Sequence, residues 1–99
     1  EAAFRLGMTA VAQERINEVR ERAGLEPISG ITIMDIWKER RLELAMEQDR
    51  MFDLRRQGRA AEVMQALGYP FVEGKHELYP IPQEQIDQSG GILEQNPGY

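Results

Sequence analysis

Apolar residues recur at helical spacing through the first quarter of the chain. Most of them fall three or four positions apart and form one stripe: Met8, Val11, Ala12, Ile16, Val19 and Ala23. This spacing predicts an amphipathic helix. Gly24 stands where a helix commonly ends in a left-handed residue, and Pro27 prevents its continuation. We therefore expect one helix that ends at about Ala23.

Thr32 and Asp35 mark the start of a second predicted helix. Thr32 is an N-cap candidate, and Asp35, three residues later, completes the pattern of a capping box. The helical pattern runs from residue 33 to about residue 46 and resumes over residues 53–57 before a glycine. The sequence leaves open whether this helix breaks near Gln48.

The final third of the chain has a different character. A short helix is predicted over residues 60–67, again closed by a glycine. Residues 78–82 read Leu-Tyr-Pro-Ile-Pro, and each proline fixes φ and pushes the residue before it out of the α region. Residues 83–86 favour a single helical turn. We interpret residues 1–70 as a helical portion, and residues 71–99 as an extended strap and C-terminal tail of the same mainly α domain.

Composition narrows the class of protein. The 99 residues, 41% hydrophobic and 29% charged, are typical of one soluble globular domain or part of one. A net charge of −5 argues against a nucleic-acid partner, because phosphate binding relies on concentrated Lys and Arg. The absence of cysteine excludes disulfides and thiolate sites. No apolar run is long enough to span a bilayer, and the abrupt start favours a piece of a longer chain.

Charged residues are concentrated between Trp37 and Gly58, among apolar ones. Four of them are spaced by three and four positions, which in a continuous helix would place them on one face: Arg40, Glu43, Glu47 and Arg50. Asp53 extends the series. We expect these five residues to form a partly buried structural ionic network that specifies how the helices pack.

Two other interpretations of these charges stay open. Glu43 and Glu47 are candidates for a catalytic acid–base pair, but neighbouring arginines favour the ionised form of both carboxylates, whereas such catalysis needs two separated pKa values. The charged face is also a candidate surface for a partner protein. From residue chemistry alone, the chain is a helical binding or interaction module.

Other candidate sites are weaker. Glu73 and His76 have one of the spacings found in metal sites, but without a helix to hold them, so a loop histidine is the simpler interpretation. Aromatic residues outside the helices are interpreted as anchors of the core or strap in preference to platforms for sugar rings: Tyr69, Phe71, Tyr79 and Tyr99.

Four motifs in this order resemble the C-terminal end of the SusD/RagB family. They are INEVRERAGL, the charged stretch from Trp37 to Gly58, HELYPIPQEQI and LEQNPGY. The matching positions are Asn17, Val19, Arg20, Arg22, Ala23 and Gly24, then Glu39, Arg40, Glu43 and Leu44, then Glu47, Arg50, Asp53, Leu54, Arg56 and Gly58, then Pro80–Pro82, and finally Gln95–Tyr99. Gln48 departs from the family, which usually has glycine there.

The resemblance implies a mainly α fold with tetratricopeptide-like helix pairs. It also implies a surface lipoprotein, tethered to the outer membrane by an N-terminal lipid, that binds glycans or peptides and delivers them to a TonB-dependent transporter of the SusC type. It implies neither enzymatic activity nor a cofactor or metal, and it places the ligand contacts upstream of this segment, so no ligand-binding residue is assigned. The alternative is an intracellular helical module for protein–protein interaction.

Overall fold

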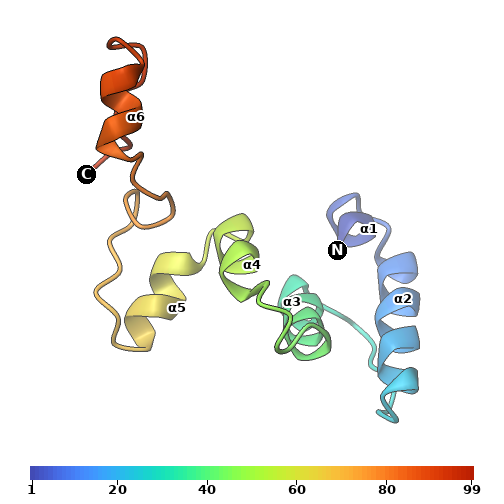
Figure 1. Cartoon of the computed structure of the whole chain (residues 1–99). Coiled ribbons are helices and arrows are strands. Elements are labelled where there is room, and N and C mark those ends of the chain that lie inside the picture. The colour runs from blue at the N-terminus through green and yellow to red at the C-terminus, as the bar shows by residue number, and fades with distance from the viewer. The chain divides into compact units, whose positions relative to one another are not determined.

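The computed structural model describes residues 1–99 and contains helices without strands (Figure 1). The chain divides into two compact units, Glu1–Arg50 and Met51–Tyr99. The helices are α1 (Ala2–Arg5), α2 (Thr9–Arg22), α3 (Ile33–Glu43), α4 (Arg50–Arg56), α5 (Ala60–Ala66) and α6 (Gln83–Gln88). The expected mainly α fold is confirmed.

The first predicted helix is interrupted near its start. Gly7 has a φ of +77° and separates α1 from α2. Ala12 and Ile16 are buried, but Met8 and Val11 are exposed, and so is Ala23 beyond the end of α2. The predicted apolar stripe is therefore only partly buried, because the chain turns before Met8 and the first unit covers only the middle of α2.

The predicted end of α2 is confirmed. Gly24 has a φ of +71°. Its N–H donates to the carbonyl of Glu21 at 2.9 Å, and the N–H of Leu25 donates to that of Arg20 at 2.9 Å. This pair of bonds is the Schellman motif, which satisfies carbonyls that a helix end leaves without partners. Gly58 and Gly68 follow α4 and α5 in the same left-handed conformation.

The predicted start of α3 is also confirmed. The Thr32 hydroxyl accepts from the N–H of Asp35 at 3.4 Å, and the Asp35 carboxylate accepts from the N–H of Thr32 at 2.8 Å. Ile31 and Ile36 flank this capping box, and both are buried. The cap thus fixes the direction in which the chain enters the core of the first unit.

The continuous helix expected to reach residue 46 is wrong. α3 ends at Glu43, and Met46 and Gln48 then adopt positive φ values of 72° and 64° before α4 begins at Arg50. The left-handed conformation costs a non-glycine residue roughly 1 kcal/mol or more in free energy. The break therefore falls where Gln48 replaces the glycine usual in the resembling family.

Each unit has its own small core. In the first, Ala12 and Ile16 of α2 pack with Ile31 and Ile36 at the start of α3. In the second, Leu54, Ala60 and Phe71 are buried together, with parts of α4 and α5 packed around them.

The last two helices follow the sequence-based expectation. The helix predicted over residues 60–67 is confirmed as α5. The helical turn predicted after Pro82 is longer than expected and forms α6.

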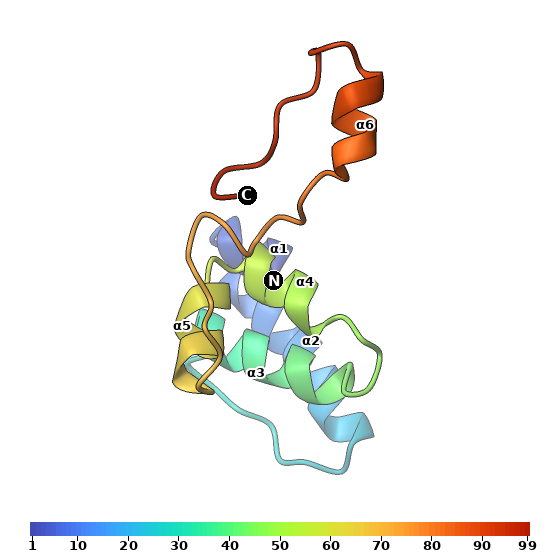
Figure 2. The same cartoon turned by 60° about the vertical axis from the view of Figure 1, so that its left-hand side comes forward.

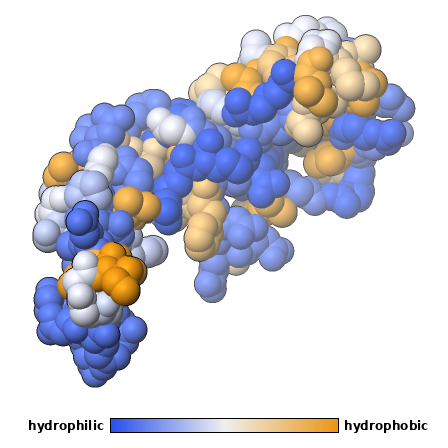
Figure 3. All heavy atoms as spheres, turned by 90° about the horizontal axis from the view of Figure 1, so that it is seen from above, coloured by the Kyte–Doolittle hydropathy of each residue, from blue (hydrophilic) through white to orange (hydrophobic).

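Much apolar surface stays exposed. On the face seen in Figure 3, apolar patches interrupt a mostly hydrophilic surface. The most exposed large apolar side chains are Leu6, Met46, Phe52, Leu67, Tyr79 and Ile92. None of the helices has the length and apolar character needed to cross a membrane.

Candidate functional site

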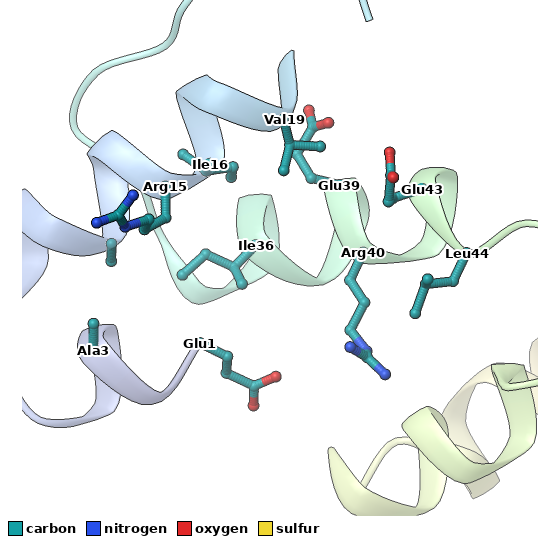
Figure 4. Close-up of a pocket in the computed structure, with 11 residues that line it drawn as sticks. Glu1, Ala3, Arg15, Ile16, Val19, Ile36, Glu39, Arg40, Glu43 and Leu44 are labelled. Atoms are coloured by element: carbon teal, nitrogen blue, oxygen red, sulfur yellow. The ribbon is translucent and has the colours of Figure 1, made fainter. Parts of the chain in front are cut away.

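The first unit contains a cavity of about 290 Å³ between α1, α2 and α3. Its apolar wall includes Ile16 and Val19 from α2 and Ile36 from α3, and Figure 4 shows these side chains around the opening. Its charged wall is formed by Glu1, Arg15, Glu39, Arg40 and Glu43. A half-apolar hollow of this size is near the lower limit for a small-molecule pocket.

Glu39, on the charged wall of this cavity, belongs to a largely buried ion pair. The Arg20 guanidinium on α2 donates to the Glu39 carboxylate on α3, and these side chains are only 17% and 10% exposed. The Nε of Arg20 also donates to the carbonyl of Glu26 at 2.8 Å. One side chain thus ties together two helices and the loop that joins them. The guanidinium is suited to this because its donors are fixed in one plane.

A second ion pair joins the same two helices farther out. Arg22 donates to Glu43, and these side chains are 68% and 40% exposed. Water screens such a pair, so its contribution to stability is small. The two pairs lie between the C-terminal ends of α2 and α3, and together they set the register of α3 against α2.

The five residues of the expected ionic network do not share one helical face. Arg40 and Glu43 lie on α3, but Glu47 is exposed in the loop after it, and Arg50 begins α4. That geometry was wrong because it required an unbroken helix. Asp53 is buried on α4 and accepts from Arg56 at 3.2 Å. The membership of all five in one network stays a prediction.

Arg20 and Glu39 were missing from the expected network. Both match the resembling family's motifs, but they are 19 positions apart in the sequence, so helical spacing alone does not pair them. Asn17 was missed in the same way. Its amide donates to the carbonyl of Ile28 at 3.0 Å and accepts from the N–H of Ile28 at 2.9 Å, which holds the loop between α2 and α3.

The arrangement offers little to acid–base catalysis. Glu39 and Glu43 each hold an arginine of α2. Both carboxylates are thus engaged in ion pairs between the helices and are not free to act on a substrate. Glu43 and Glu47 do not share a helical face, since α3 ends between them. The geometry therefore supports the structural interpretation of Glu43 over the catalytic one.

The side chain of His76 makes its contacts within the turn that contains it. Its Nδ1 accepts from the N–H of Val72 at 2.8 Å, and its ring meets the ring of Phe71 edge-on at 5.4 Å between centroids. No group of three or more side chains from His, Asp and Glu comes together in a way that would hold a metal ion. The loop-histidine interpretation thus has a physical basis, in which the ring closes the turn beside the core of the second unit.

The aromatic residues outside the helices have different roles. Phe71 is buried in the core of the second unit, and the Tyr99 hydroxyl donates to the carbonyl of Leu78 at 2.9 Å. These two contacts fit the expectation of core and strap anchors. Tyr69 and Tyr79 are 57% and 75% exposed, so their rings do not anchor either unit.

Hydrogen bonds shift pKa values at two helix starts. The Thr32 hydroxyl and N–H both donate to Asp35, and they lower the pKa of its carboxyl from the ordinary value of 3.8. At the start of α5, Arg59 donates twice to Glu62 and lowers the pKa of that carboxyl. Both carboxylates sit in the first turn of a helix, where negative charge is favoured.

Comparison with known protein families matches residues 1–99, the whole chain, to the SusD family. No curated protein and no solved structure gives a match. The features that carry the resemblance have defined positions in the structure: Arg20, Glu39 and Glu43 form the ion pairs between α2 and α3, and Gly24 and Gly58 end α2 and α4. The chain belongs to the SusD family.

Proposed function

We propose that this chain is the C-terminal structural part of a surface lipoprotein that binds a glycan or related nutrient and delivers it to a TonB-dependent outer-membrane transporter. The observation that carries the proposal is the match to the SusD family over residues 1–99. That family is one of nutrient-binding proteins of the outer membrane, not of enzymes. The transporter would be of the SusC type, and a lipid at the N-terminus of the full-length protein would provide the membrane anchor.

The contacts of the charged residues support a structural role for this segment. Glu39 and Glu43 bind arginines of a neighbouring helix, and the Asp53 carboxylate accepts from Arg56 on its own helix. These carboxylates are engaged by arginines within the fold, although Glu39 and Glu43 also lie at the wall of the cavity.

Fractionation of the source cells tests the proposal. An antibody raised against residues 76–99 should detect a protein several times larger than this chain in the outer-membrane fraction. Purification with this antibody in mild detergent should recover a large β-barrel transporter in similar amount. A small soluble band without such a partner would contradict the proposal and would favour the alternative, an intracellular module for protein–protein interaction.

A further inference from the structure

The amide side chain of Gln95 pairs with the backbone of the Pro-Ile-Pro strap. Its Oε1 accepts from the N–H of Ile81 at 2.8 Å, and its Nε2 donates to the carbonyl of Ile81 at 2.8 Å. Pro80 and Pro82 have no N–H, so Ile81 offers the one backbone donor of these three residues. A single carboxamide therefore satisfies both backbone groups of Ile81, as a neighbouring β-strand would.

The residues that follow Gln95 continue this pairing in the antiparallel direction. Asn96 donates from Nδ2 to the carbonyl of Tyr79 at 2.7 Å, and Tyr99 donates from its hydroxyl to the carbonyl of Leu78 at 2.9 Å. As residues 95–99 advance, their partners on the strap recede from Ile81 to Leu78. Three side chains thus contact the carbonyls of Ile81, Tyr79 and Leu78, on both sides of the first proline.

Gly98 brings Tyr99 back to the strap. It has a φ of +84°, and a Cβ at this position would lie 3.0 Å from Cδ of Lys75. The Nζ of Lys75 lies 4.7 Å from the centre of the Tyr99 ring, within the range of a cation–π contact. Gln95, Asn96, Gly98 and Tyr99 of this motif therefore each have a physical role, and the glycine allows the close approach that the tyrosine makes.

The segment between the strap and Gln95 has almost no apolar anchoring of its own. Figure 2 shows the chain leaving the strap through α6, turning at its far end and coming back. No residue of α6 is buried, and at the turn Ile92 is 84% exposed and Leu93 is 43% exposed. The return of this segment to the strap consequently depends on the polar contacts made by residues 95–99.

We infer that residues 95–99 form a clasp on residues 78–81, and that residues 83–94 are an arm that the clasp holds and that opens as one unit. The closed state is held by a few hydrogen bonds and one cation–π contact, each of which contributes modestly in water. The core around Leu54 and Phe71 makes none of these bonds. The clasp can therefore open while the rest of the second unit stays folded, which makes the arm a built-in conformational switch.

Amide hydrogen exchange of the full chain, read residue by residue by NMR, tests this inference. Gln95→Ala removes both bonds to Ile81 and should speed exchange of the Ile81 amide by about tenfold or more. Tyr99→Phe removes only the bond to Leu78 and keeps the ring over Lys75. If the clasp opens as one unit, this remote change should also speed Ile81 exchange, by roughly fivefold.

Two controls make the result decisive. Gln88→Ala deletes an amide of the same type, whose bond to Glu84 stays within α6, and it should leave Ile81 exchange unchanged. The amides of Arg59 and Val63, which donate to the carbonyls of Leu54 and Arg59 beside the core of the second unit, should keep their protection in every variant. The inference is overturned if Tyr99→Phe leaves Ile81 exchange unchanged, if Ile81 already exchanges at the unfolded rate in the wild type, or if the core amides lose protection together with Ile81.

Discussion

Replacing Arg20 by alanine should destabilise the first unit far more than replacing Arg22. Both arginines lie at the end of α2 and pair with glutamates of α3, but their surroundings differ. The Arg20–Glu39 side chains are 17% and 10% exposed, whereas those of Arg22–Glu43 are 68% and 40% exposed. The pairs therefore differ in exposure and in the additional bond from Arg20 to the carbonyl of Glu26.

The magnitude follows from what each substitution leaves behind. Removing one partner of a fully buried ion pair costs about 3–5 kcal/mol, because the other charge stays buried without it. Arg20 and Glu39 retain some contact with water, so the cost of breaking this pair is expected to be below that range. The lost bond from Arg20 to the Glu26 carbonyl adds about 1 kcal/mol to the cost. We expect a loss of about 2–3 kcal/mol for Arg20→Ala and of less than about 0.5 kcal/mol for Arg22→Ala.

Urea unfolding measures both values through the fluorescence of Trp37, the one tryptophan of the chain. Trp37 lies on α3 and is half-buried, so it reports on the first unit. The slope of the unfolding free energy against urea concentration should be the same in the wild type and the variants. This would show that unfolding exposes the same amount of surface in each protein. Arg20→Lys keeps the charge but not the planar donors, and should recover only part of the loss.

Equal losses for Arg20→Ala and Arg22→Ala would refute this reasoning, since exposure would then not decide the strength of the pairs. A loss below about 0.5 kcal/mol for Arg20→Ala would show that the inner pair behaves as a surface pair. The double variant Arg20→Met with Glu39→Leu provides an independent check. It should be more stable than Arg20→Ala, because no buried charge is left behind.

Three further predictions concern other parts of the chain. Thr32→Ala should lower the unfolding free energy by about 1 kcal/mol through loss of the N-cap. In the wild type, the pKa of Asp35 is lowered in the folded state, so its stabilising contribution should be present above pH 3.8. This contribution should disappear as the pH falls through the folded pKa, which circular dichroism in acid would follow. Phe71→Ala should cost about 3–4 kcal/mol in the second unit, because it empties a core position that is 8% exposed, and calorimetry should show the corresponding transition at lower temperature. Glu47→Ala should change the unfolding free energy, measured by urea denaturation, by less than about 0.5 kcal/mol, since this side chain is exposed in the loop after α3. A larger loss would support the expected network.

Local signals predicted the helix boundaries well. The capping box at Thr32 and the glycine ends at Gly24 and Gly58 involve residues within five positions of each other, so their geometry follows from the local sequence. The sequence left open whether the helix breaks near Gln48. Residue types alone could not decide this, because Met46 and Gln48 adopt left-handed conformations that both residue types disfavour.

The partners in the ion pairs between α2 and α3 could not be predicted from helical spacing. The charge pattern indicated that Glu43 lies close to arginine, within its own helix or from a neighbouring one, but it did not identify which arginine of the neighbouring helix pairs with it. The actual partners come from α2, at sequence separations of 19 and 21. Helical periodicity identifies which residues share a face, whereas the choice between facing partners depends on how two helices pack, which periodicity does not specify.

Titration of the full chain with gluco-, xylo- and manno-oligosaccharides, followed by isothermal calorimetry, tests the claim that this segment is structural. The account predicts no saturable binding, because the charged residues are engaged within the fold and the cavity between α1, α2 and α3 is small and half-apolar. Binding of any of these sugars with a Kd tighter than about 100 μM, abolished by a substitution at the cavity wall such as Arg15→Ala, would contradict it.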